Sequence, residues 1–481
     1  MESMRNRRWG GARVIAGALA LCTAVADAGD RAPLPSMAPF PNASGFAATY
    51  STTGPIDFDD PFFKSFGSNG RSCDTCHQPS EGWTITPEGV QARFDASGGT
   101  DPVFRTVDGS NAPNVDVSTV EARRAAYSML LSKALIRVGM PIPANAEFEL
   151  VAVDDPYGHA SSADLSLFRR PLPSTNLRFL SAVMWDGRET FLDAGSRDCV
   201  LGTSSCFASL DVNLEHQANG ATTGHAQAAQ ELSEADRAAI VAFETSLYTA
   251  QVYDNEAGSL TARHATGGPR PLAEAPFYFG INDVVSGDYR TGGLFKSVVF
   301  DLYDTWDASL KMLGIDAPDH RVTTARASIL RGQTLFNTHP ITITGVKGLN
   351  DDLSVPVLQG TCTTCHDAPG AGDHSIPAPL DIGVADASRR TPDMPLYTLR
   401  NKQTGATIQT TDPGRALVSG RWKDIARFKG PVLRAVATRA PYFHNGMAKD
   451  LRAVVDFYDT RFDIHFTEAD KRDLVAFLRT L

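Results

Sequence analysis

The stretch "RSCDTCHQP", residues 71 to 79, decides how the rest of the chain is interpreted. It places two cysteines three positions apart and follows the second at once with a histidine, and the same pattern returns in "GTCTTCHDA", residues 360 to 368. The chain contains only 7 Cys and 11 His among its 481 residues. Two such pentads in so cysteine-poor a sequence indicate a shared chemical purpose.

Three kinds of chemistry use closely spaced cysteines. A thioredoxin-like dithiol does not need the histidine, and a zinc site built from both pairs gives no reason for a histidine directly after each. Covalent haem attachment explains every position, because two thiols bond to the porphyrin and the next histidine ligates the iron. We therefore expect two covalently bound haem c groups, held by Cys73, Cys76, His77, Cys362, Cys365 and His366.

Residues 1–28 have the form of a signal peptide. Arginines precede an apolar run from Val14 to Val25, and the small residues Ala26 and Ala28 close it. The run is shorter than the roughly 20 residues that a membrane helix needs. We expect an exported, periplasmic protein with no membrane span.

The charged residues of the chain indicate which kinds of partner the protein can bind. The chain has 45 Lys and Arg against 55 Asp and Glu, a formal net charge of −10. An acidic surface argues against binding to nucleic acid or anionic membrane, and it suits a basic protein partner. The length predicts two or more domains.

Two cysteines remain outside the pentads and the signal peptide. Cys199 and Cys206 lie close together in "CVLGTSSC". In an oxidising compartment we expect them to close a small loop as a disulfide.

An internal repeat divides the chain. "SEADRAAIVAFETSL" (233–247) and "TEADKRDLVAFLRTL" (467–481) agree at seven of fifteen positions, and each begins with a helix N-cap, Ser233 or Thr467. Each segment follows its own pentad, as the closing helix of a cytochrome c unit would. We expect a mainly α fold of two cytochrome c-like haem domains with long loops and few short strands. The predicted parts are an N-terminal haem domain, 29–260, a linker or insertion, 261–325, and a C-terminal haem domain, 326–481.

Local patterns predict three further elements. Residues 118–139 are expected to form one helix that begins with a capping box of Ser118 and Glu121. Residues 326–336 are expected to open the second haem unit as a helix, and 147–153 to form a strand.

Several motifs together resemble a known family. "MWDGRE" (184–189), "RFKGPVLRAVATRAPYFHNG" (427–446) and "AVVDFYDTRF" (453–462), beside the second pentad, are similar to the bacterial di-haem cytochrome c peroxidases and their MauG-type relatives. The resemblance implies that the haem on His77 binds the oxidant and that the haem on His366 relays electrons. It also puts Trp185 between the haems as a station for electron transfer, against the alternative of a core residue.

The resemblance extends to the second iron and to calcium. Aligning "LRAVVDFY" places Tyr458 where MauG-type proteins have an iron ligand, with Met447 as the rival thioether ligand and simple packing of Tyr458 as the third reading. The family's calcium site relies on an Asn upstream of the tryptophan. Pro171 stands there in this sequence, which leaves calcium open.

The residues expected on the side of the first haem opposite His77 differ from those of the family, which has a Gln followed by a catalytic Glu. Here "LEHQANGATTGHAQA" (214–228) supplies Gln217 and, near the Glu position, His225. A neutral imidazole serves as base and then as acid, so we expect His225 to move the proton and Gln217 to orient the oxidant. The alternatives are that His225 ligates the iron or lies on the surface.

These features predict a peroxidase that reduces hydrogen peroxide with electrons from a small redox protein, a cytochrome c or a cupredoxin. A second hypothesis is oxidation of an organic or protein substrate, with peroxide or dioxygen, as in MauG-like proteins. A third is an electron carrier without catalytic activity, with both irons closed to ligands.

Overall fold

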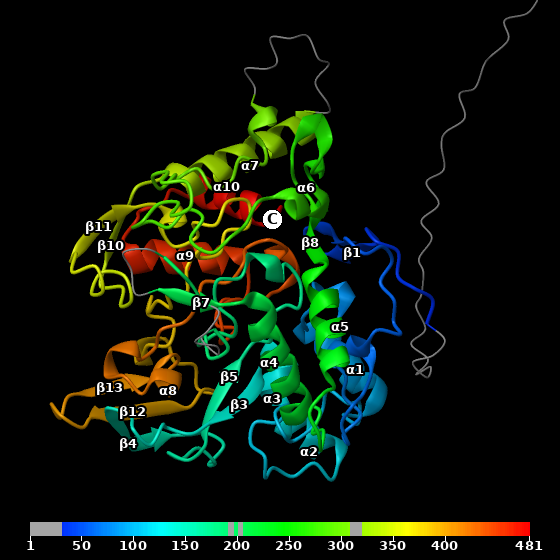
Figure 1. The fold of residues 1–481 in the computed structure, drawn as a ribbon, viewed down its shortest axis with the longest axis vertical. Helices are drawn as coiled ribbons and strands as arrows, with labels where there is room; N and C mark the ends of the chain where they lie inside the picture. The colour runs from blue at the N-terminus through cyan, green and yellow to red at the C-terminus, as the bar shows by residue number, and fades with distance from the viewer. Residues whose placement is uncertain (1–30, 191–196, 201–204, 308–319) are drawn as a thin grey trace, which may run out of the picture.

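The computed structural model describes residues 31–190, 197–200, 205–307 and 320–481 (Figure 1). The predicted signal peptide lies outside the described residues. The α-helices are α1 (Pro87–Ser97), α2 (Val120–Ala126), α3 (Ser128–Lys133), α4 (Leu210–Gly224), α5 (Glu234–Thr245), α6 (Pro269–Glu274), α7 (His320–Thr338), α8 (Ala416–Ser419), α9 (Leu451–Phe462) and α10 (Glu468–Leu478). None of those in the described ranges has the length and apolar character that crossing a membrane requires.

The expectation of a mainly α fold is wrong, because 31% of the residues that the structure describes are helical and 19% are in strands or β-bridges. The strands are β1 (Pro39–Asn42), β2 (Gly45–Ser51), β3 (Ile136–Met140), β4 (Phe148–Asp154), β5 (Leu165–Arg169), β6 (Arg197–Cys199), β7 (Cys206–Ala208), β8 (Leu247–Asp254), β9 (Gly258–Ser259), β10 (Ile341–Thr344), β11 (Val357–Gly360), β12 (Leu396–Asn401) and β13 (Thr407–Thr410). They form one sheet of order β1-β2-β8-β9, one of order β13-β12-β4, and three two-stranded ribbons. With two to eight residues each, these strands are too short to stand out as alternating patterns.

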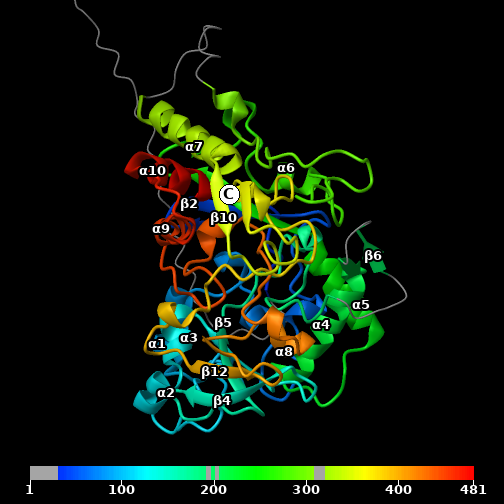
Figure 2. The same ribbon diagram turned by 90° about the vertical axis from the view of Figure 1, so that its left-hand side faces the viewer.

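The two larger sheets join segments that are far apart in the sequence. β2 pairs antiparallel with β8, so the start of the described chain lies beside the strand that follows α5. β4 pairs with β12 and thereby crosses from the predicted N-terminal haem domain to the C-terminal one. Both ribbon views show β4 and β12 side by side (Figures 1 and 2). The domain limits at 260 and 326 stay predictions.

The repeated segments are the helices α5 and α10, and their N-caps are confirmed. Ser233 accepts a hydrogen bond from the backbone N–H of Asp236, and Thr467 accepts one from that of Asp470. α10 lies along α7 (Figures 1 and 2), where Asp473 accepts hydrogen bonds from Ser328 at 2.5 Å and Arg331 at 2.6 Å. Apolar side chains of both helices share one buried core.

The single helix expected over 118–139 is wrong. α2 and α3 replace it, and the chain then turns into β3. Thr119, not Ser118, caps α2 by accepting from Ala122 N at 3.1 Å. Ala134 adopts a left-handed conformation with φ of 49° and ends α3, after which β3 pairs with β5. The predicted strand at 147–153 is confirmed as β4, and the helix at 326–336 lies within α7. The predicted linker contains α6.

Candidate haem sites

Both pentads fold into the same tight turn. Residues Cys73–Thr75 and Cys362–Thr364 each form one turn of 3₁₀ helix. In the first, the backbone N–H groups of Cys76 and His77 both donate to the carbonyl of Cys73, and the second repeats this geometry at Cys362. The turn therefore brings two thiols and one imidazole together, as attachment of one haem to each pentad requires.

Each pentad histidine is held through the ring nitrogen that an iron would not use. Nδ1 of His77 donates to the carbonyl of Trp83 at 3.0 Å, and Nδ1 of His366 donates to that of Gly372 at 2.6 Å. Burial lowers the pKa of both rings, to about 4 for His77, and this outweighs the opposing effect of the hydrogen bond. Both rings are therefore neutral at pH 7, with Nε2 left to ligate a metal.

The four pentad thiols do not have the properties of a redox-active dithiol. They are unpaired, and burial raises the pKa of each, to about 12 for Cys362 and Cys365. A redox dithiol needs a lowered thiol pKa. The described residues also contain no cluster of three or more His, Cys, Asp or Glu that could hold a metal ion. The donor set thus fits haem attachment better than either alternative.

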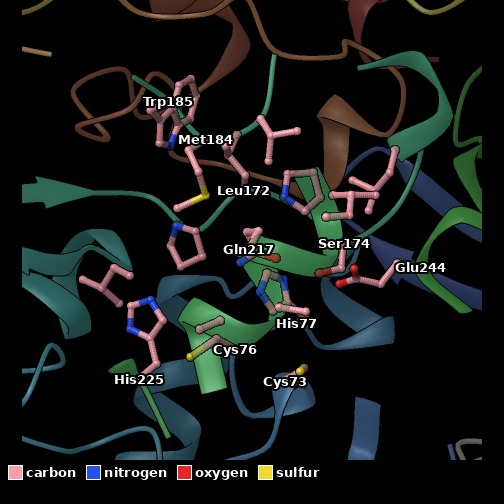
Figure 3. Close-up of a pocket in the computed structure, with 18 of the residues that line it drawn as sticks. Cys73, Cys76, His77, Leu172, Ser174, Met184, Trp185, Gln217, His225 and Glu244 are labelled. Carbon is pink, nitrogen blue, oxygen red and sulfur yellow. The ribbon is translucent and has the colours of Figure 1, made fainter. Parts of the chain in front are cut away.

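A single cavity extends from the first pentad toward the C-terminal part of the chain. Figure 3 shows Cys73, Cys76 and His77 at one end and Trp185 at the other, with His225 and Glu244 on opposite flanks. Much of the wall is apolar, as the faces of a porphyrin require. Representative apolar lining residues are Ile136, Val138, Leu172, Leu180, Val183 and Leu214. Basic side chains that suit the carboxylates of a haem line it too: Arg188, Lys429 and Arg439.

His225 lies on this wall and is bound to a carboxylate that the sequence analysis missed. It caps the C-terminal end of α4, and its Nδ1 forms a short hydrogen bond with Asp108. Asp108 is buried and also binds Arg71 at 2.5 Å. Burial alone would raise the pKa of Asp108, but its hydrogen bond with His225 and the charge of Arg71 hold that pKa below its usual range. An ionised Asp108 therefore fixes Nδ1–H of His225 and leaves Nε2 as the other reactive nitrogen.

The structure brings the remaining predicted residues of the first site together. Gln217, on α4, lines the cavity with His77 and His225 (Figure 3). Pro171 also belongs to the wall, and its carbonyl accepts a hydrogen bond from Thr84.

Trp185 lies where the cavity meets the C-terminal segment. Its indole N–H donates to the carbonyl of Arg170 at 2.8 Å, and its own carbonyl accepts from Lys429 N at 2.9 Å. Its ring is 6.2 Å from that of His444, which stacks on Phe428 at 3.9 Å. The tryptophan thus contacts the "RFKGP" and "YFHNG" motifs while it lines the first cavity.

The second pentad lies against α7, which packs on α10, and close to Tyr458 of α9. The His366 ring is 6.0 Å from Phe336 of α7, and Cys362 packs against the core that α7 and α10 share. Burial raises the pKa of Tyr458, and the neighbouring Cys365 and Cys362 add to this effect, which places the phenol near the second pentad. Met447 sits in the loop before α9, where its backbone N–H donates to Asn445. Tyr458 therefore lies near the second pentad, and the choice between Tyr458 and Met447 as the second iron ligand stays a prediction.

Outside the haem sites, Cys199 and Cys206 form a disulfide with an S–S distance of 2.06 Å, which joins β6 to β7.

Comparison with known proteins supports the family suggested by the motifs. No protein-family model matches the chain. The chain is 31% identical over 140 residues to cytochrome-c peroxidase IdrP1 of Pseudomonas sp. (strain SCT), a match that covers 25% of this chain and 36% of that protein. It is 30% identical over 133 residues to cytochrome-c peroxidase IdrP2 of Denitromonas iodatirespirans, covering 26% of this chain and 36% of that protein. The chain thus spans about a third of the length of these relatives.

A solved structure of a MauG-like protein associated with microbial copper homeostasis aligns with 88% of this chain and 87% of its own, at 14% identity and a TM-score of 0.32. That score is too low to show a common fold. The two curated relatives confirm the predicted resemblance to cytochrome c peroxidases.

Proposed function

We propose that this chain, a relative of the bacterial cytochrome c peroxidases, reduces hydrogen peroxide to water at the haem held by Cys73, Cys76 and His77. Each peroxide takes two electrons from a small donor protein, a cytochrome c or a cupredoxin, and two protons from solvent. The haem iron, when bound, supplies the coordination site and the electron transfer for cleavage of the O–O bond. The proposal is supported above all by the pair of His225 and Asp108 on the cavity wall.

His225 carries the proton. With Nδ1–H bonded to Asp108, its Nε2 takes a proton from one peroxide oxygen and returns it to the other. Asp108 is a positioning residue, because it acts through the imidazole, and buried Arg71 holds it in place. Gln217 orients the peroxide from the same helix that ends at His225.

The C-terminal haem, on His366, passes electrons toward the first site, and Trp185 lies on the way between the two pentads. We further propose export to the periplasm. The pattern of residues 1–28 and the disulfide between Cys199 and Cys206 support this location, because disulfides persist in oxidising compartments.

His225→Ala tests the proposal. We expect both haems to stay attached and peroxide consumption to slow by about 10²- to 10⁴-fold, the usual effect of losing a positioned proton-transfer group. The matched control is His216→Ala on the same helix, because His216 is 61% exposed and paired with Glu189 at the surface. It should leave the rate unchanged.

Two outcomes contradict the assigned role. If the first haem changes from low-spin to high-spin and reacts faster with peroxide, His225 is an iron ligand. An unchanged rate and spectrum removes His225 from the site altogether. Wild-type protein with both irons closed and no peroxide turnover would favour the electron carrier.

A further inference from the structure

The first haem cavity contains a carboxyl group that the proposed peroxide chemistry does not use. Glu244, near the end of α5, is 5% exposed and lines the cavity wall. Its Oε2 atom is buried and has no hydrogen-bond partner among the described residues. Figure 3 shows its carboxylate beside Ser174, on the opposite flank from His225. Burying a carboxyl group without full hydrogen bonding is costly, so its presence calls for a function.

The internal repeat shows that the fold does not need this carboxyl group. Aligning the two repeated segments puts Glu244 of "VAFETSL" at the position of Leu478 in "VAFLRTL". Leu478 is 7% exposed and belongs to the apolar core of the second haem unit. The same helix position is therefore apolar beside one haem and ionisable beside the other.

The surroundings of Glu244 favour its neutral form. Burial raises the pKa of Glu244 to about 7, a hydrogen bond from Ser174 opposes this, and the charge of Asp60 adds to it. A group with such a pKa changes its protonation with a small change in nearby charge.

Among the described residues, the elements packed most extensively against α5 supply no cation that neutralises Glu244. They are α4, η2 (Pro61–Phe63) and η5 (Leu177–Phe179), and Cys73 of the first pentad packs against the apolar core to which α5 contributes Ile240. Asp60 immediately precedes η2. The charge of Lys64, which follows η2, opposes the burial that raises the pKa of Asp60. Arg178 of η5 binds Thr245 and pairs with Asp211 of α4. The remaining ionisable side chains on these elements are Glu215 and His216 of α4, and Cys73, Asp74, Cys76 and His77 of the pentad.

We propose that Glu244 binds a proton when the haem attached through Cys73 and Cys76 is reduced, and releases it when that haem is oxidised. The inference rests on the haem attachment proposed above. One electron arrives from an external one-electron donor, one proton arrives from solvent, and the only bond formed is O–H on the carboxyl group. Reduction removes one positive charge from the iron, so the carboxylate becomes less favourable and gains the proton. By linkage, protonation of Glu244 raises the reduction potential.

The test is the midpoint potential of each haem, measured by spectroelectrochemistry from pH 5 to pH 9. In the wild type we expect the potential of one haem to fall with rising pH around pH 7. At full coupling the reduction equilibrium changes tenfold per pH unit, which for one electron is about 59 mV. Glu244→Gln should abolish this slope. Glu234→Gln, an exposed carboxyl group on the same helix, should keep it.

A second variant and a second readout keep the test decisive. Glu244→Leu places the side chain of the other haem unit at this position and covers the case in which Gln disturbs folding. The reduced-minus-oxidised infrared spectrum of the wild type should show the C=O stretch of a protonated carboxyl group, and both variants should lack it. A slope that persists in both variants, or a wild type without a slope, overturns the proposal.

The two proposals fail in different ways. Denatured protein that has lost the haem at Cys73 and Cys76 would overturn the proposed function. Two attached haems with pH-independent potentials would overturn the role of Glu244 alone.

Discussion

Glu244→Leu should alter the pH dependence of stability. Burial raises the pKa of Glu244 in the folded chain to about 7, against 4.5 for an ordinary glutamate. Below pH 4.5 the side chain is protonated in both the folded and the unfolded chain, so folding does not bury a charged carboxylate and Glu244 does not lower the free energy of unfolding. Between pH 4.5 and 7 the unfolded chain releases the proton while the folded chain retains it, so rising pH favours unfolding. Above pH 7 the carboxylate is ionised in both states, and the free energy of unfolding is lowered by the full cost of burying it.

The size of this penalty follows from the two pKa values. The difference between about 7 and 4.5, at about 1.36 kcal/mol per pKa unit, amounts to about 3 kcal/mol. We therefore expect the free energy of unfolding of the wild type to fall by about 3 kcal/mol relative to Glu244→Leu between pH 4.5 and pH 8.

Urea unfolding of the haem-bound protein kept reduced, so that the iron adds no extra positive charge beside Glu244, measures this difference by circular dichroism at several pH values. Glu234→Leu is the control, because its side chain is exposed on the same helix. Its stability relative to the wild type should vary much less with pH. A difference between wild type and Glu244→Leu that stays constant across the range would refute the reasoning.

Three other substitutions test the remaining parts of the account. Trp185→Phe should leave both haem spectra near normal and slow turnover in stopped-flow measurements; unchanged kinetics with several donors would make Trp185 a packing residue. Tyr458→Phe should change the spectrum of the C-terminal haem alone, whereas Met447→Leu should not, and the opposite pattern would make Met447 the ligand. Arg169→Met should lower the free energy of unfolding by about 3–5 kcal/mol, because it leaves the buried carboxylates of Asp186 and Asp412 without their shared cation. A urea midpoint equal to that of the wild type would contradict this last expectation.

Sequence patterns were informative where the chemistry is local. The pentads specify their own turn, because the residues that form it are consecutive. The N-caps at Ser233 and Thr467 and the strand β4 were predictable for the same reason: each depends on neighbours within a few residues. The position of Trp185 required the family resemblance, since no local rule places it beside residues of the C-terminal motifs.

The parts that sequence did not reveal depend on distant contacts. Asp108 is a single aspartate in a loop, and only the fold brings it to His225, 117 residues later. The sheets likewise form between remote segments, as in the pairing of β4 with β12. For Glu244, in contrast, the sequence itself contained a signal of its unusual position. Aligning the repeats revealed seven identities, but the informative position was the mismatch with Leu478.

Intact-mass measurement of the denatured wild-type protein tests the central claim most directly. The account predicts a chain that carries two covalently bound haems, with one lost when Cys73 and Cys76 are both replaced by Ala and the other lost when Cys362 and Cys365 are. A wild-type chain that yields its haem intact to acid-acetone and shows the mass of the polypeptide alone would contradict the account.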